Sequence, residues 1–338
     1  MKVFVTGGTG YIGSHTVVEL QQSGFEVVIV DNLCNSNIHV LDGIEKITGV
    51  RPEFEQFDLM DEKATRDFFA RHKDIKAVIH FAALKAVGES VSKPLEYYKN
   101  NLNSLMNVLS SMREFGVKNL VFSSSCTVYG QADVLPVTEQ TPRKQAESPY
   151  GNTKAMCEDI MRDLAHVEKE MNLIALRYFN PIGAHPSANI GELPNGIPNN
   201  LIPYLTQTVA GIREQLSVFG NDYNTSDGTP VRDYIDVVDL AKAHVVAIRR
   251  LLEGKNKANY EYFNIGTGNG VSVLELIQAF EKATGKKVNY KIVGRRAGDI
   301  EKVWADTTLA NTELGWKAQV PLVETLANTW RWQEKLGK

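Results

Sequence analysis

The sequence predicts an α/β fold built on a doubly wound parallel sheet, with a smaller α/β domain attached. Short apolar runs alternate with longer amphipathic stretches through the first half of the 338-residue chain. Strict alternation of this kind is typical of a parallel sheet that is covered by helices on both faces. A glycine-rich turn between the first predicted strand and the first predicted helix supports the same fold class.

The predicted elements follow one another in a regular order up to Asn180. Strands are expected at 3–6, 27–30, 54–57, 77–81, 120–123 and 174–179. Helices are expected near 12–23, 61–72, 94–115 and 149–171. Residues 181–200 contain four prolines and three glycines and are expected to form loops. Shorter elements follow, with helices near 200–211, 236–252, 272–284 and 322–334 and strands at 216–219, 263–265 and 288–292.

This change in pattern predicts two domains. Residues 1–180 are expected to form a cofactor-binding domain. Residues 181–338 are expected to form most of a smaller domain, and a return of the chain to the first domain around 234–278 is left open. The cleft between two such domains is a natural place for a ligand.

Composition narrows the function classes. A net charge of −3 with 43% hydrophobic and 23% charged residues gives no sign of a nucleic-acid or membrane surface. Cys34, Cys126 and Cys157 lie far apart without a C-x-x-C pair, and the histidines show no metal-ligand spacing. We therefore expect no metal and a reducing cytoplasm. A strand begins almost at Met1, so no signal peptide is expected, and no apolar run reaches about 18 residues.

The glycine-rich turn predicts a dinucleotide site of the Rossmann type. Its sequence is Gly7-Gly8-Thr9-Gly10-Tyr11-Ile12-Gly13, placed where the first strand meets the first helix. Glycines allow a tight turn and let backbone N–H groups approach a pyrophosphate at the helix N-terminus. The spacing is G-x-x-G-x-x-G rather than the more usual G-x-G-x-x-G, and its position carries the prediction.

Acidic residues after the next strands define the rest of this site. Asp31, eighteen residues after Gly13, can accept both ribose hydroxyls and would repel a 2′-phosphate, which favours NAD over NADP. Asp58, with Leu59, closes the third predicted strand and can accept from the adenine amino group. The residues expected to continue around the ribose are Asn32, Leu33, Cys34, Asn35 and Ser36.

Tyr150-Gly-Asn-Thr-Lys154, with Ser125 upstream, forms a candidate acid/base set. Positions i and i+4 share one face of a helix, so the Lys154 ammonium can lie beside the Tyr150 ring. A neighbouring positive charge favours phenolate and is expected to lower the pKa of Tyr150 from about 10 toward the range of a general base. The pattern Y-x-x-x-K is weak by itself, because many such pairs lie on exposed helices.

Longer motifs give the pattern a context. They are VTGGTGYIGSH at 5–15, HFAALKAVGES at 80–90, PLEYY at 94–98, FSSSCTVYG at 122–130, LRYFNP at 176–181, GIPNNL at 196–201, FGNDY at 219–223 and VRDY at 231–234. Over essentially the whole chain, they resemble the extended short-chain dehydrogenase/reductase superfamily and, within it, the UDP-glucose 4-epimerases.

The resemblance implies a role for each candidate residue. Tyr150 corresponds to the catalytic base, Lys154 to its partner on the nicotinamide ribose, and Ser125 to the hydroxyl that bonds the sugar 4-oxygen. Further NAD contacts are implied for Phe81, Ala82, Ala83, Lys85, Asn100 and Phe179. Contacts to the UDP-sugar are implied for Lys85, Asn180, Asn200, Leu201, Ser217, Val218, Phe219, Arg232, Arg296, Asp299 and Val303. Guanidinium groups suit the two phosphates of UDP because they are always charged and forked.

The implied reaction is inversion at C4 of a UDP-hexose. NAD would act as a transient hydride store while a base takes the hydroxyl proton, and the 4-keto sugar would turn in the site before reduction on its other face. Related 4,6-dehydratases place an Asp-Glu pair after the serine or threonine that corresponds to Ser125. Here those positions are Cys126 and Thr127, which argues against a dehydratase.

Val303 departs from the pattern of strict glucose/galactose epimerases, which carry a tyrosine four residues after the residue corresponding to Asp299. Valine leaves room beside the 2-position of the hexose. We therefore hypothesise that UDP-N-acetylglucosamine and UDP-N-acetylgalactosamine are also accepted.

Two other functions remain open at the level of the sequence. One is an epimerase that acts mainly on another UDP sugar, such as UDP-glucuronate or a pentose. The other is a non-catalytic NAD sensor, although such proteins typically lose the tyrosine or the lysine that Tyr150 and Lys154 retain here. The resemblance also implies a homodimer in which the helices at 94–115 and 149–171 pair between subunits.

Overall fold

The main sheet of the computed structural model, which describes residues 1–296 and 299–337, has seven parallel strands. Its order is β11-β6-β5-β4-β1-β2-β3. The strands are β1 (Lys2–Thr6), β2 (Glu26–Asp31), β3 (Glu53–Gln56), β4 (Ile75–His80), β5 (Asn119–Ser123), β6 (Asn172–Tyr178) and β11 (Tyr260–Ile265). The chain moves outward from β1 to β3 and then resumes with β4 on the other side of β1. Ligands of doubly wound sheets bind at such a switch point, beyond the carboxyl ends of the strands.

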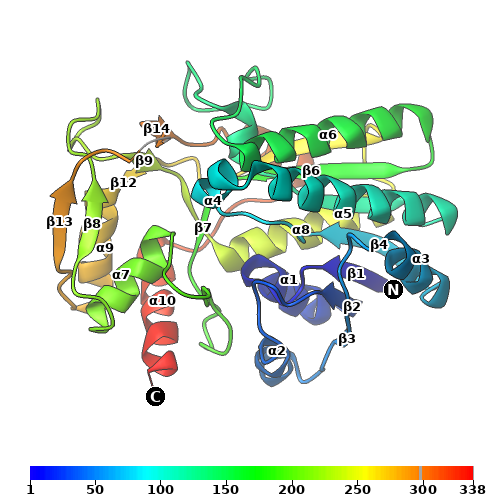
Figure 1. The fold of residues 1–338 in the computed structure, drawn as a ribbon, viewed down its shortest axis with the longest axis horizontal. Helices are drawn as coiled ribbons and strands as arrows, with labels where there is room; N and C mark the ends of the chain where they lie inside the picture. The colour runs from blue at the N-terminus through cyan, green and yellow to red at the C-terminus, as the bar shows by residue number, and fades with distance from the viewer. Residues whose placement is uncertain (297–298, 338) are drawn as a thin grey trace.

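Helices cover both faces of this sheet (Figure 1). One face carries α1 (Tyr11–Gln22), α2 (Val40–Thr48) and α8 (Val237–Leu252), and the other carries α3 (Glu62–Arg71), α5 (Pro94–Glu114) and α6 (Pro149–Val167). Successive strand residues point to opposite faces. In β1, Val3 and Val5 therefore enter the core under α1 and α8, while Phe4 packs with Phe68 and Phe69 of α3. The predicted doubly wound fold is confirmed.

The smaller part of the chain packs around its own core, which includes Leu205, Phe280 and Leu326. Its helices are α7 (Leu201–Val209), α9 (Val273–Thr284) and α10 (Leu322–Leu336). Its short sheets pair β8 (Leu216–Phe219) with β13 (Tyr290–Val293), β7 (Asn180–Ile182) with β10 (Tyr234–Asp236), and β9 (Val231–Arg232) with both β12 (Val271–Ser272) and β14 (Lys302–Val303). A short π-helical turn covers Ala310–Leu314.

The chain returns to the main sheet after entering this smaller part. Helix α8 packs against α1, and β11 pairs in parallel with β6. Both elements fall inside 234–278, where a return was left open. The domain boundary at residue 180 stays a prediction.

Several elements differ from the sequence-based expectations. Helix α2 was not predicted, because only Leu41 and Ile44 of this short segment supply a deeply buried apolar face. Helix α4 (Val87–Ser92) was not predicted either. Helix α6 ends at Val167 rather than 171, since the backbone must turn there to start β6 beside Lys118. No helix within 1–296 or 299–337 has both the length and the apolar composition required to cross a bilayer.

Candidate active site

A cavity of about 1330 Å³ opens beyond the carboxyl ends of the main strands and reaches the smaller part of the chain. It brings together most residues that the sequence predicted. Those lining it are Gly7, Gly10, Tyr11, Ile12, Gly13, Asp31, Asn32, Cys34, Asn35, Ser36, Asp58, Leu59, Phe81, Ala82, Ala83, Lys85, Asn100, Tyr150, Lys154, Asn180, Asn200, Arg232, Arg296, Asp299 and Val303. The predicted residues Leu33, Ser125, Phe179, Leu201, Ser217, Val218 and Phe219 are not among the residues that line it.

The glycine loop is packed too closely for side chains at two of its positions. Gly7 has a φ of +66°, and a Cβ there would lie 2.8 Å from the Ala82 amide nitrogen. A Cβ on Gly13 would lie 2.3 Å from the Gly7 carbonyl oxygen. Helix α1 starts directly after Gly10, which has no side chain to cap its first N–H groups. These open N–H groups and the close approach of the backbone fit the pyrophosphate of a dinucleotide.

Asp31 organises the loop after β2. Its Oδ1 accepts from the Leu33 amide at 2.9 Å and from the Ser36 hydroxyl at 3.1 Å, and its Oδ2 accepts from the Thr9 amide at 3.3 Å. Leu33 has a φ of +59°, so the chain turns sharply beneath this carboxylate. The predicted ribose loop is thus tied to the glycine loop through Asp31.

Asp58 lies beyond the end of its strand, because β3 ends at Gln56 rather than at the predicted position. Its Oδ2 accepts from the Asn32 side-chain amide at 3.0 Å, and its Oδ1 accepts from the Met60 amide at 2.9 Å. The carboxylate therefore lies beside the ribose loop and also lines the cavity.

Helix α6 presents Tyr150 and Lys154 to the cavity. It begins at Pro149, and its N-cap Ser148 accepts from the Gly151 amide at 3.2 Å. The Lys154 Nζ lies 5.9 Å from the centroid of the Tyr150 ring and donates to the Ser123 carbonyl oxygen at 2.7 Å. Both side chains are buried, and so is Ser125, which lies between Ser123 and the short 3₁₀ helix η1 (Cys126–Tyr129).

The expected lowering of the Tyr150 pKa was wrong. Burial raises the pKa of Tyr150 well above its ordinary value, the nearby Tyr178 raises it further, and a hydrogen bond with Ser125 opposes the shift. Burial also lowers the pKa of Lys154 to about 8. The sequence showed that a lysine stands beside the tyrosine, but it could not show that both groups leave water, and desolvation disfavours the charged form of each.

The smaller part of the chain contributes two arginines to the cavity. The Arg296 Nη2 donates to the Asp299 Oδ1 at 2.8 Å, and its guanidinium lies 5.3 Å from the centroid of the Phe219 ring. Arg232 on β9 pairs in register with Val303 on β14, so the two residues lie side by side. Phe219 therefore contacts a cavity residue without lining the cavity itself.

Three predicted apolar residues, Val218, Phe179 and Val303, lie in two different buried clusters. Val218 is 1% exposed and packs into the core of the smaller part, which leaves only its backbone for a ligand. Val303 and Phe179 pack together in a small buried cluster with Val128, and Val303 also faces the cavity.

Glu192 is a cavity residue that the sequence did not single out. Its Oε1 accepts from the Asn200 side-chain amide at 2.7 Å and lies 3.8 Å from the Lys85 Nζ. It belongs to a proline- and glycine-rich segment that read only as loop. Thr127, on η1, was considered only as a missing acid, yet the residue lines the cavity. Its hydroxyl is buried and has no hydrogen-bond partner in the described chain.

A metal centre has no counterpart among the side chains that can be placed. Within residues 1–296 and 299–337, no group of three His, Cys, Asp or Glu side chains could hold a metal ion. The expectation of metal-free chemistry stays a prediction.

Comparison with known proteins identifies the family. The model of the NAD dependent epimerase/dehydratase family matches residues 3–266. The chain belongs to this family. It is 54% identical over 333 residues to the UDP-glucose 4-epimerase of Bacillus subtilis, covering 98% of this chain and 97% of the relative. The family assignment confirms the resemblance and the NAD prediction.

Solved structures of family members match the fold closely. One is a UDP-glucose-4-epimerase from Stenotrophomonas maltophila with bound NAD and formylated UDP-arabinopyranose, with a TM-score of 0.96, 50% identity, and coverage of 100% of this chain and 99% of that one. Another, from Bifidobacterium longum in complex with NAD+ and UDP, has a TM-score of 0.94, 46% identity, and coverage of 99% and 98%.

Proposed function

We propose that the protein is an NAD-dependent epimerase that inverts C4 of UDP-hexoses and interconverts UDP-glucose and UDP-galactose through a transient 4-keto sugar. The observation that carries this proposal is the meeting of Tyr150 and Lys154 with Arg232 and Arg296 at one cavity, which also contains the glycine loop. Relatives about half identical over nearly the whole chain are UDP-glucose 4-epimerases, which supports the same activity.

The residues would divide the chemistry as follows. Bound NAD supplies a hydride acceptor for the carbon that is inverted. The Tyr150 oxygen would take the proton of the 4-hydroxyl. The Ser125 hydroxyl, which does not line the cavity but bonds to Tyr150, would have to reach the sugar 4-oxygen from beside that phenol. Lys154, whose pKa burial lowers to about 8, still carries its charge in much of the population at neutral pH, and this charge would favour the phenolate against the burial that raises the Tyr150 pKa. Because these groups are buried, water competes little with them.

The UDP group would be held from the other side of the cavity. Arg232 and Arg296 suit its two phosphates, since guanidinium groups form forked, charged hydrogen bonds. Asp299, which Arg296 holds at 2.8 Å, would accept the uridine ribose hydroxyls.

Turnover without added cofactor tests the proposal. Purified enzyme, with no NAD added, should convert UDP-glucose to UDP-galactose, followed by NMR or by a coupled assay. The same assay on UDP-glucuronate and UDP-pentoses tests the main alternative. Faster turnover of either of these than of UDP-glucose would contradict the assignment, and an enzyme that bound NAD but converted no UDP sugar would favour a sensor.

We extend the proposal to the two N-acetylated UDP-hexoses because of Val303. This small side chain lines the cavity directly beside Arg232, where a tyrosine would project further. Val303→Tyr should lower kcat/KM for UDP-N-acetylglucosamine about 10- to 100-fold more than for UDP-glucose, the range typical of steric discrimination in a pocket. Val303→Ala is the matched control, and its kcat/KM for both sugars should stay close to that of the wild type. Equal losses for both sugars in Val303→Tyr would contradict the hypothesis.

We also propose a cytoplasmic homodimer that pairs through α5 and α6. These helices pack side by side and expose apolar side chains, including Leu95, Met106 and Met156. Cys34, Cys126 and Cys157 are all free thiols, which suits a reducing compartment. Light scattering should give twice the monomer mass, and Met106→Glu should halve it. A monomeric wild-type protein would overturn the dimer.

A further inference from the structure

A buried ion pair joins helix α6 to β6. Glu158 is 1% exposed, and Arg177 on β6 is 4% exposed. The Arg177 Nε donates to the Glu158 Oε1 at 2.9 Å, and its Nη2 donates to Oε2 at 2.6 Å. Glu158 lies one helical turn beyond Lys154 and two turns beyond Tyr150. The pair therefore fixes the helix that carries both proposed catalytic residues.

The same pair holds the chain on both sides of Ser125. Before it, the Ser124 hydroxyl donates to the Glu158 Oε1 at 2.6 Å. After it, the Tyr129 hydroxyl accepts from the Arg177 Nη1 at 2.9 Å. Ser125 thus lies on a six-residue segment whose two ends are bonded to one ion pair.

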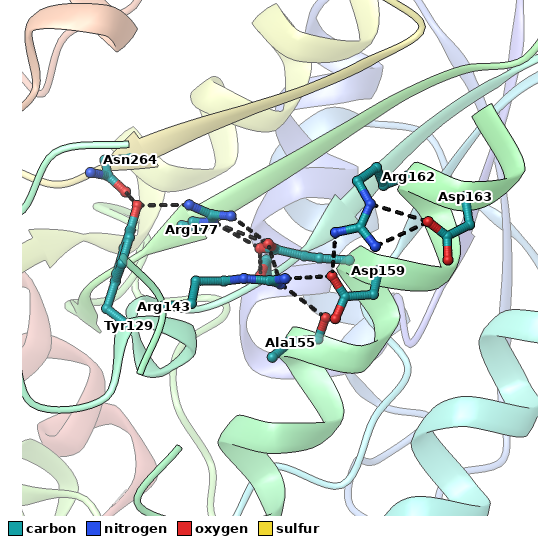
Figure 2. A network of polar contacts seen from close by, with 10 residues as sticks. Tyr129, Arg143, Ala155, Asp159, Arg162, Asp163, Arg177 and Asn264 are labelled. Carbon is teal, nitrogen blue, oxygen red and sulfur yellow. Dashed lines mark hydrogen bonds and ion pairs between the residues drawn. The ribbon is translucent and has the colours of Figure 1, made fainter. Parts of the chain in front are cut away.

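The network extends outward in two directions (Figure 2). Tyr129 donates to the Asn264 Oδ1 at 2.7 Å, which links it to β11. On the other side, Arg143 donates to the Ala155 carbonyl oxygen at 3.2 Å and to the Asp159 carboxylate, and its Nη1 lies 3.6 Å from the Glu158 Oε2. Helix α6 is therefore held at Ala155, Glu158 and Asp159 by groups from outside it.

Stability alone is a weak reason for such a pair. A buried ion pair loses the hydration of both charges, and replacing both partners by apolar residues of similar volume is often neutral or stabilising. An apolar pair would lack the directional hydrogen bonds by which this ion pair fixes the Ser124 and Tyr129 side chains relative to α6. Misplacement of reacting groups by about 1 Å can lower a rate about a hundredfold.

We propose that Ser124, Tyr129, Glu158 and Arg177 are positioning residues that hold Ser125 in register with Tyr150 and Lys154. None of the four is proposed to touch the reacting atoms. The proposal rests on the proposed epimerisation, since it concerns how the same site keeps its geometry.

Ser124→Ala is the mildest test, because it removes only the hydroxyl that joins β5 to Glu158. We expect kcat for UDP-glucose to fall on the order of tenfold to a hundredfold. KM should stay within about twofold and the NAD content should be unchanged, because the cofactor and UDP contacts remain in place. Ser111→Ala is the matched control, a buried serine on α5 outside the network, and it should keep wild-type kcat.

A second pair of variants separates positioning from stability. Glu158→Met leaves Arg177 buried without its partner and should lower the melting temperature strongly. Combining it with Arg177→Met should restore the melting temperature but leave kcat low. The proposal is overturned if Ser124→Ala matches Ser111→Ala in kcat, or if the double variant regains kcat together with stability. A wild-type enzyme without turnover would instead refute the proposed epimerisation, so the two failures are distinguishable.

Discussion

Gly13→Ala should separate cofactor binding from overall stability. The new Cβ would stand 2.3 Å from the Gly7 carbonyl oxygen and 2.9 Å from the Gly8 Cα. Side-chain carbons need at least about 3.0 Å, so the start of α1 would have to move away from the loop by roughly 0.7 Å or more. The N–H groups predicted to face the pyrophosphate move with it. A displacement near 1 Å of groups that position a reactant can lower a rate about a hundredfold. We expect a loss of NAD affinity of the same order.

Gly24→Ala provides the control. Gly24 follows α1 with a φ of +82°, and a Cβ there meets nothing within 4 Å. Alanine at position 24 should lower the free energy of unfolding by about 1–2 kcal/mol, because a residue with a Cβ disfavours this backbone conformation. The glycine loop should not be affected. Calorimetric titration of NAD and melting curves should therefore show weakened binding for Gly13→Ala alone and modest destabilisation for Gly24→Ala. Equal NAD affinity in the two variants would refute the close-approach argument.

Three further changes test individual groups. Tyr150→Phe should lower kcat by about 10²- to 10⁴-fold with the NAD content, measured by absorbance, unchanged; intact turnover at neutral pH would show that the phenol is not the base. Burial lowers the pKa of Lys154 from 10.5 to about 8, so the cost of its buried charge, about 3 kcal/mol, is present below pH 8 and disappears as the pH rises toward 10.5. In urea titrations, Lys154→Met should therefore gain stability relative to wild type at pH 7 compared with pH 10, whereas a pH-independent difference would contradict the shift. Asp31→Ala should weaken NAD more than NADP, and an unchanged ratio of their dissociation constants would remove its proposed role.

The sequence signals for the cofactor half of the site are local. Glycines at a strand-to-helix junction and an aspartate at the end of the next strand predict a dinucleotide site in a doubly wound parallel sheet, because the carboxyl ends of the strands share one edge. Gly7, Gly13 and Asp31 accordingly line one cavity. The fold class followed from the same alternation of strands and helices.

The substrate half was predicted through resemblance rather than through pattern. Arg232 and Val303 are brought together by short strands, β9 and β14, that neither periodicity nor propensity indicates. Val218 and Phe219 alternate on β8, so one enters the core and the other meets Arg296. A two-residue strand is specified by its tertiary neighbours, and a single sequence does not contain them.

Burial is the quantity that the sequence could not supply, and it links the two largest departures. The spacing of Tyr150 and Lys154 is a property of a helix, but their pKa shifts arise from the sheet and loops that close over that helix. Glu158 continues the same helical face and reads as an ordinary charged residue, yet it is sealed against Arg177. Desolvation that disfavours charge at the first two positions would do the same at Glu158 without its partner. The proposed positioning role of the Glu158–Arg177 pair follows from this burial, because the pair holds the helix face that also carries Tyr150 and Lys154.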